Sequence, residues 1–188
     1  EVRSTPSVVD GTVYATTANN GVYAIDAATG TVEWSVSTES QMYGSPVVAG
    51  GTGYAGSFGG SLYALDATNG TQLWNVSTQG AIAGAPAVAD GRIYLGQYDG
   101  TVAAFDTETG SRDWQVSTGG RITSATTVAN NHVYVGSTDS RVYALDSQSG
   151  SLAWQFETGG AIYGSVAIAD GRVFTPSNDN RLYAIGAD

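Results

Sequence analysis

The stretch AIDAATGTVEW, residues 24–34, decides the fold because the chain repeats it at a fixed interval. It returns as ALDATNGTQLW at 64–74, AFDTETGSRDW at 104–114 and ALDSQSGSLAW at 144–154, always forty residues later. Self-similarity at such a period indicates a repeat architecture, in which each unit buries its faces only against its neighbours. The organisation of the whole chain therefore follows from this repeat.

Turn signals divide each forty-residue unit into four strands. In the third unit they are Asp90-Gly91, Asp99-Gly100 and Thr109-Gly110, pairs of the kind that close β-hairpins. The predicted strands of this unit, from inside to outside, are 83–89, 92–97, 101–106 and 111–117. Three hairpins in succession make one four-stranded antiparallel sheet per unit.

Composition agrees with an all-β chain. Glycine (26 residues) interrupts any helical pattern about every ten residues, and tyrosine (11) and tryptophan (4) favour strands. A period of forty with four strands is typical of a β-propeller blade. The predicted fold is a β-propeller of four complete blades plus a three-stranded fifth. The repeat units are 1–40, 41–80, 81–120, 121–160 and 161–188.

Each residue of the repeated phrase has a structural explanation. The glycine supplies the positive φ that the last hairpin needs, and the aspartate accepts hydrogen bonds from turn amides. Alanine leaves room for an indole, so the tryptophan packs on the next blade with its N–H meeting a backbone carbonyl. The predicted docking residues are Ala24, Asp26, Gly30, Trp34, Ala64, Asp66, Gly70, Trp74, Ala104, Asp106, Gly110, Trp114, Ala144, Asp146, Gly150 and Trp154.

The phrase A-x-D-x-x-T-G-x-x-x-W resembles the tryptophan-docking motif of pyrroloquinoline-quinone (PQQ)-type propeller repeats, and the resemblance covers essentially the whole chain. Such repeats occur in quinoprotein alcohol dehydrogenases and in the bacterial outer-membrane assembly lipoprotein. A dehydrogenase of this kind implies PQQ, a Ca²⁺ ion, an aspartate base and often two adjacent cysteines. The chain has no cysteine, and no Asp or Glu breaks the forty-residue pattern in a way that singles it out as a base. We therefore expect a protein that is not an enzyme, with no catalytic, cofactor or metal residues.

The fifth unit lacks the docking phrase, because Gly186 stands at the aspartate position and no tryptophan follows. Pro6 aligns with Pro46 and Pro86, so the chain starts at an innermost strand and offers no spare outer strand. Three arrangements remain: part of a larger ring of seven or eight blades, a five-bladed ring with a three-stranded last blade, or association of copies through open blade edges.

Charge limits the partners. The formal net charge is −10, and all seven basic residues are arginine. An acidic surface repels nucleic acid and anionic lipid, and no apolar run approaches the ~20 residues of a membrane span. A lysine-free, Asp- and Thr-rich surface favours a halophilic archaeal protein, with an ordinary acidic secreted protein as the alternative. We expect an extracellular or cell-surface location without membrane insertion.

Other sites are weakly supported. His132 is the only histidine and is expected in a solvated turn, which argues against a catalytic triad or a zinc site. STDSR at 137–141 and SNDNR at 177–181 carry oxygen ligands suited to Ca²⁺, but Asn and Asp are also the normal turn formers there. Calcium is therefore the minor alternative.

What remains is the face formed by the loops between blades and the turns between second and third strands, which varies most between units. Aromatic and arginine side chains in variable loops are typical of interfaces, so we expect a protein or glycan ligand there. The predicted binding residues are Tyr43, Phe58, Tyr98, Arg121, Asp139, Tyr163 and Asp179. Alternatively, Tyr43 and Tyr163 pack beside the channel. The functional alternatives are a fragment of a PQQ-dependent dehydrogenase whose catalytic residues lie elsewhere, and a self-assembling subunit.

Overall fold

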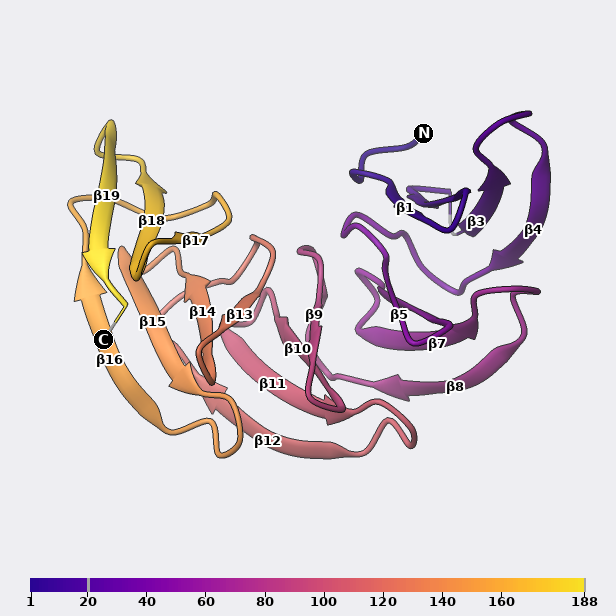
Figure 1. Cartoon of the computed structure of the whole chain (residues 1–188). Coiled ribbons are helices and arrows are strands. Elements are labelled where there is room, and N and C mark those ends of the chain that lie inside the picture. Colours follow the sequence, from indigo (N-terminus) through magenta and orange to yellow (C-terminus); the bar gives the residue numbers. More distant parts are fainter. Residues whose placement is uncertain (20, 188) are drawn as a thin grey trace. The chain divides into compact units, whose positions relative to one another are not determined.

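A computed structural model describes residues 1–19 and 21–187, and in them the chain forms nineteen strands and no helix (Figure 1). Blade 1 contains β1 (Ser7–Val9), β2 (Thr12–Thr17), β3 (Gly21–Asp26) and β4 (Val32–Ser37). Blade 2 contains β5 (Val47–Ala49), β6 (Thr52–Gly56), β7 (Ser61–Asp66) and β8 (Gln72–Ser77). Blade 3 contains β9 (Ala87–Ala89), β10 (Arg92–Gly96), β11 (Thr101–Asp106) and β12 (Arg112–Ser117). Blade 4 contains β13 (Thr127–Ala129), β14 (His132–Gly136), β15 (Arg141–Asp146) and β16 (Leu152–Glu157). Blade 5 contains β17 (Ala167–Ala169), β18 (Arg172–Ser177) and β19 (Arg181–Gly186).

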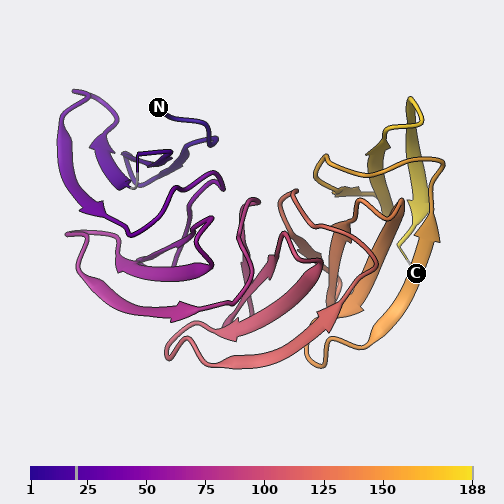
Figure 2. The same ribbon diagram turned by 180° about the vertical axis from the view of Figure 1, so that it is seen from behind.

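Each blade is one antiparallel sheet whose strands lie in sequence order. Four sheets have four strands and the last has three, so this part of the predicted fold is confirmed. The chain divides into two compact units, Glu1–Pro86 with blades 1 and 2 and Ala87–Asp188 with blades 3 to 5. In the second unit, Figure 1 shows the short strands β9, β13 and β17 along one side and β12 and β16 along the other. Seen from behind in Figure 2, the first unit (indigo to purple) likewise has its long fourth strands on one side.

The innermost strand is shorter than predicted. Residues 83–89 were expected to form it in the third unit, but only Ala87–Ala89 pair with β10. Pro86 has no N–H to give to a ladder, and the Ile82 N–H donates instead to the Ser57 carbonyl at 3.0 Å. The segment before each first strand therefore belongs to the loop between blades rather than to the sheet.

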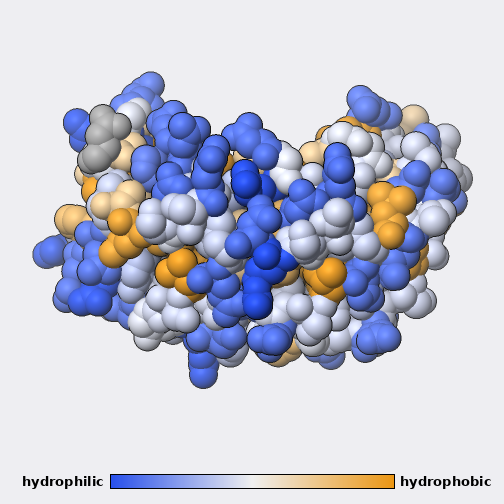
Figure 3. All heavy atoms as spheres, turned by 90° about the horizontal axis from the view of Figure 1, so that it is seen from below, coloured by the Kyte–Doolittle hydropathy of each residue, from blue (hydrophilic) through white to orange (hydrophobic). Residues whose placement is uncertain are grey.

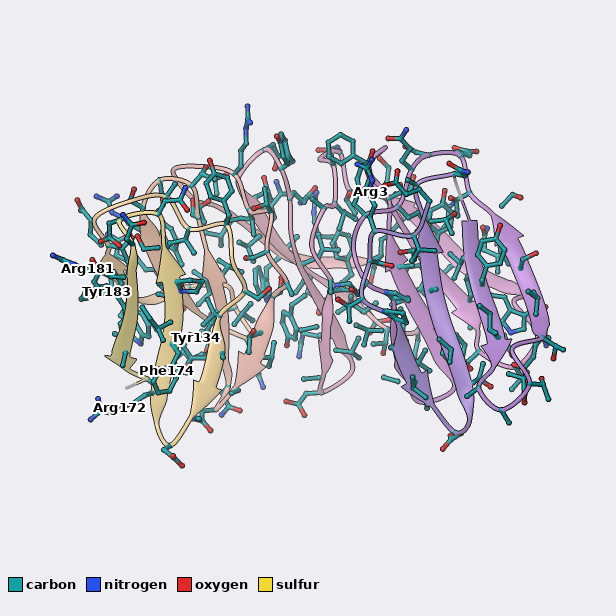
Figure 4. The ribbon with its side chains drawn as sticks, turned by 90° about the horizontal axis from the view of Figure 1, so that it is seen from above. Arg3, Tyr134, Arg172, Phe174, Arg181 and Tyr183 are labelled. Carbon is teal, nitrogen blue, oxygen red and sulfur yellow. The ribbon has the colours of Figure 1, made fainter. Side chains whose placement is uncertain are left out.

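The two ends of the strands differ in their connections. The loop end carries the segments that join successive blades, such as 38–46, and the turns between second and third strands, such as 57–60. The turn end carries the hairpins between first and second strands and those between third and fourth strands. In Figure 4, Arg181 and Tyr183 of blade 5 lie towards the loop end of their sheet and Arg172 lies at its turn end.

The core consists of apolar layers between neighbouring blades. In the second unit, Trp114 of blade 3 packs with Val133 and Leu145 of blade 4. In the first unit, Val22 and Trp34 of blade 1 pack with buried residues of blade 2. Burying one such aliphatic side chain contributes about 1.5–3 kcal/mol, so each blade depends on its neighbour for stability.

Hydrophobic atoms on the face seen from below form separate spots divided by hydrophilic atoms (Figure 3). The fourth strands themselves carry exposed Val32, Leu73 and Leu152. Apolar residues that are exposed singly are normal for a soluble surface and indicate no binding site by themselves.

Candidate functional site

The repeated phrase forms a tight turn held by its aspartate. In blade 1, Asp26 Oδ1 accepts the Thr29 N–H at 2.7 Å and the Thr29 hydroxyl at 2.6 Å, and the Gly30 N–H donates to the Asp26 carbonyl at 2.8 Å. The hydroxyl of a turn residue, aided by its amide, lowers the pKa of each motif carboxyl below its usual value because these bonds favour the ionised form. This holds for Asp26, Asp66, Asp106 and Asp146.

The tryptophans reach across to the next blade. Trp34 Nε1 donates to the Ala67 carbonyl at 3.0 Å, Trp114 to Ser147 at 3.0 Å and Trp154 to Ala187 at 3.2 Å. Each acceptor is the first residue after the motif aspartate position of the following blade. The last acceptor belongs to blade 5, whose own sequence lacks the aspartate and the tryptophan.

A tyrosine shares the same acceptor, and sequence reasoning did not identify this contact. The hydroxyl of Tyr14 donates to the Ala67 carbonyl at 3.1 Å, and that of Tyr134 donates to Ala187 at 3.3 Å. The ring centroids of Tyr14 and Trp34 are 6.0 Å apart. The recurrence of tyrosine at positions 14, 54, 94 and 134 was the available signal, but a recurring residue does not name its partner.

The motif glycine receives the indole of the preceding blade as well as closing its own turn. Gly150 has φ +73°, and a Cβ there would lie 2.6 Å from Trp114 Cε3. Gly70, with φ +75°, would meet Trp34 Cε3 at 2.7 Å. The motif therefore joins a blade to both of its neighbours. Its tryptophan packs on the following blade, and its glycine receives the tryptophan of the preceding blade.

In the first unit, predicted binding residues meet at the loop end. The rings of Tyr43 and Phe58 pack edge to face with centroids 5.3 Å apart. The Arg3 guanidinium lies 5.7 Å from the Tyr43 ring centroid, and Figure 4 places Arg3 at this end of its unit. The Tyr43 hydroxyl also donates to Gln41 Oε1. Phe58 remains 39% exposed, so the cluster presents an aromatic surface to solvent.

In the second unit, Arg121 stacks on Tyr98. Its guanidinium carbon lies 4.6 Å from the ring centroid, and Nη1 donates to the Tyr98 hydroxyl at 3.0 Å. The stacking holds a cation over an aromatic face at the surface. Tyr163 is 56% exposed.

The two aspartates of the predicted binding face are engaged within the fold. Asp139 Oδ2 accepts the Gly119 N–H at 2.9 Å and the Tyr143 hydroxyl at 2.5 Å. Asp179 repeats this arrangement with the Gly159 N–H and the Tyr183 hydroxyl. Burial and the bond to Asp139 raise the pKa of Tyr143, while the bond from Tyr183 lowers the pKa of Asp179. These carboxylates link a turn to the loop of the preceding blade, and sequence reasoning missed both tyrosines.

Side chains that could bind a metal do not gather in the described residues. Over residues 1–19 and 21–187, no group of three or more His, Cys, Asp or Glu side chains is placed to hold a metal ion. His132 Nδ1 lies 2.8 Å from the Asn130 carbonyl in its turn. Nor does this part of the chain contain a helix long and apolar enough to cross a membrane.

Family models match both parts of the chain. The model described as outer membrane protein assembly factor BamB matches residues 40–127 and 114–188. The model described as glucose/ethanol/alcohol dehydrogenase, beta-propeller domain, matches residues 1–45. A search of curated proteins found no match.

Several solved structures share the fold. BamB from Moraxella catarrhalis matches with a TM-score of 0.90 at 19% identity, over 100% of this chain and 62% of that one. Quinohemoprotein alcohol dehydrogenase ADHIIG from Pseudomonas putida HK5 matches with a TM-score of 0.88 at 23% identity, over 99% and 40%. The computationally designed Ika8 protein matches with a TM-score of 0.87 at 18% identity, over 96% and 57%.

The chain thus spans less than two thirds of each of these structures. At such identities the structural likeness shows the fold, which confirms the predicted propeller architecture. Membership of the family is shown by the BamB family model, which matches this sequence in two overlapping segments that together cover residues 40–188. The protein therefore belongs to the PQQ-repeat β-propeller family described as outer membrane protein assembly factor BamB.

Proposed function

We propose that this chain is a non-enzymatic binding module that holds a partner protein, or a glycan, at the loop ends of its blades. The observation that carries the proposal is the exposed aromatic and arginine clustering there, with Phe58 against Tyr43 in one unit and Arg121 on Tyr98 in the other. Aromatic side chains bury a large area at low entropic cost, and arginine adds a charged planar group that stacks on them; both types are enriched in binding hot spots.

The turn end has a different composition. Its hairpins repeat Asp-Gly, Asn and Thr, and their side chains serve the turns themselves, as Asp106 does for Thr109. Membership in a family named for an assembly factor supports a role in holding other proteins. The formal net charge of −10 favours a partner with a basic or neutral contact surface.

Location forms part of the proposal. Because the matching family is described as an outer membrane protein assembly factor, we propose that this chain is exported to the cell envelope or surface. Adaptation to high salt in a halophilic archaeon remains a proposal based on the lysine-free acidic composition. Fractionation of the source cells with an antibody to the chain tests the location, and recovery in the cytoplasmic fraction would contradict it.

Site-specific cross-linking tests the binding function. A photoreactive phenylalanine analogue replaces Phe58 or Tyr163, and the matched control carries it at Val32, an exposed position on β4 (57%). We expect one discrete adduct in envelope extracts from the loop-end positions, and a weaker one from position 58 when Tyr43 is also changed to alanine. Equal labelling from position 32, or no adduct from positions 58 and 163, contradicts the proposal.

A second function is favoured by one observation, the match of residues 1–45 to a dehydrogenase propeller domain. In that case the chain is part of a PQQ-dependent sugar or alcohol dehydrogenase whose catalytic residues lie outside this sequence. Titration of the chain with PQQ and Ca²⁺, followed by dye-linked alcohol oxidation, separates the two. Saturable quinone binding favours the dehydrogenase, and turnover by this chain alone overturns the binding-module proposal.

A further inference from the structure

The first unit contains a cavity of about 700 Å³ at its turn end, between blades 1 and 2. Its floor includes the buried residues Tyr14 and Ala67. Thr12 and Glu33 line the blade 1 side, and Gly50 and Gly51 line the blade 2 side. The glutamate and both glycines are exposed, so the cavity opens to solvent. It lies at the opposite end of the strands from the proposed partner surface and is independent of it.

The charged side chains that line the cavity are all acidic. Asp10 and Glu33 supply two carboxylates, and none of the described lining residues is basic. Burial is the main cause of the raised pKa of Tyr14, and the negative charges of Glu33, Asp10 and Asp66 raise it further. A positive group that enters the cavity therefore meets a favourable field that solvent screens only in part.

Glu33 points to this corner because of a β-bulge. On β3, Ala24 pairs with Trp34 and Ile25 pairs with Val32, so Glu33 is the extra residue on β4. Bulges re-aim a side chain relative to its strand. The carboxylate accepts the Thr12 hydroxyl at 3.1 Å and still has lone pairs to offer.

Blade 3 has the same corner with a cation in it. Asp113 is the bulge residue there, and Arg92 occupies the position that Thr12 has in blade 1. Arg92 Nε donates to Asp113 Oδ2 at 2.7 Å, with both side chains about 30% exposed. The Arg92 guanidinium is also close enough to Tyr94 to influence its pKa, just as Thr12 and Glu33 influence that of Tyr14. Blade 3 therefore shows that the bulge carboxylate of this corner pairs with a guanidinium that lies near a tyrosine.

We propose that the cavity between blades 1 and 2 binds a guanidinium group from another molecule, in the position that Arg92 fills in blade 3. The planar fork donates to Glu33, and a further N–H reaches the oxygen of Tyr14, whose own proton goes to the Ala67 carbonyl. Asp10 at the rim adds long-range attraction. The aliphatic stem of the ligand lies against Val9 and Val48 of the lining.

NMR titration of the whole chain with argininamide at low salt tests the site. We expect saturable shifts of the Gly50, Gly51 and Thr68 amides, with no response to the amide of citrulline, which has the same shape without the charge. Glu33→Gln should weaken binding about tenfold, the loss of one charge-assisted contact. Glu108→Gln, which removes one exposed charge from a blade 3 turn, is the matched control and should leave the affinity unchanged.

A second variant keeps the test decisive if Glu33→Gln disturbs folding. Thr12→Arg gives blade 1 the side chain that blade 3 has, so its own guanidinium should fill the corner and abolish binding. Unchanged binding in this variant, an equal response to citrullinamide, or shifts spread without saturation over the acidic surface would each overturn the proposal.

The same titration distinguishes the two sources of a guanidinium. If free argininamide binds as tightly as a short neutral peptide with one arginine, the natural ligand is a small molecule. If the peptide binds at least about tenfold more tightly and its citrulline form does not bind, the guanidinium belongs to a partner protein.

Discussion

At the residue scale, the repeated motif contacts the two neighbouring blades through different residues. Trp34, Trp114 and Trp154 each donate to a carbonyl on the next blade, and Gly70 and Gly150 leave space for the indole of the preceding blade. At Gly70 and Gly150, glycine is required for two separate reasons: the positive φ and the indole that lies where a Cβ would be. Blade 1 has the first reason alone, because nothing lies within 4 Å of a Cβ built on Gly30.

Substituting these two glycines separates the effects. Gly30 and Gly150 both have φ +73°, so alanine at either position should cost about 1 kcal/mol for the left-handed conformation. Gly150→Ala should cost a further ~1–3 kcal/mol because its Cβ meets the Trp114 ring. Denaturant unfolding of the two variants measures the difference. Equal losses of unfolding free energy in the two variants would show that the Trp114 indole does not need the space beside Gly150.

The motif aspartates make stability depend on pH. Hydrogen bonds from Ser149 lower the folded pKa of Asp146 below the unfolded value of about 3.9. The stabilisation is therefore complete above that value and is lost as the pH falls through the folded pKa. Asp146→Asn should be less stable than the parent at pH 7, and the gap should close in acid. A gap that stays constant from pH 7 to acid pH would exclude this carboxylate as the cause.

At the element scale, the second strands of the five blades are not equally well packed. In four blades the second residue of this strand is apolar. Three of these residues, Ile93, Val133 and Val173, are fully buried. Blade 2 has Gly53 there instead. A glycine inside a strand adds backbone entropy to the unfolded chain and contributes no side chain to the layer between blades.

Filling this position should stabilise the first unit. A Cβ at Gly53 would meet the Leu65 carbonyl oxygen at 3.8 Å and Val48 Cγ2 at 3.9 Å, which are ordinary contacts. Gly53→Ala should therefore raise the free energy of unfolding by about 0.4–1 kcal/mol. Gly56→Ala on the same strand should lower it, since its Cβ would lie 2.4 Å from Ile82 Cγ2. Thermal unfolding of both variants gives the two signs, and stabilisation by Gly56→Ala would refute the packing argument.

At the scale of the whole molecule, charge is the dominant global property. The net charge of −10 on 188 residues repels itself, and only seven arginines oppose it. Three ion pairs are present in the described residues, and all involve partly exposed groups that contribute little in water. We therefore expect dissolved cations, more than these ion pairs, to screen the repulsion between the carboxylates.

Salt should accordingly stabilise the protein at neutral pH. The screening length falls from roughly 10 Å at 0.1 M to roughly 3 Å at 1 M, so the melting temperature should rise over this range. Near the isoelectric point of about 4.2 the self-repulsion is small, and the same increase in salt should have a much weaker effect. A rise of equal size at both pH values would assign the effect to general salting-out instead of charge screening.

The amino-acid sequence by itself determined the forty-residue period, the all-β class, the hairpin positions and the three-stranded last blade. These depend on backbone conformations and on alternating burial within one unit, so a local pattern contains them. It also selected Tyr43, Phe58, Tyr98 and Arg121 as surface residues, although their binding role stays a proposal.

Only the tertiary structure decided which groups meet across blades. The shared carbonyl of Ala67, the locking of Asp139 by Tyr143 and the cavity beside Glu33 join residues from different strands or different blades. Their geometry depends on how far one sheet is displaced over the next and on side chains such as Thr12, which is small where blade 3 has arginine. Spacing along the chain identifies a blade, but packing between blades creates the sites.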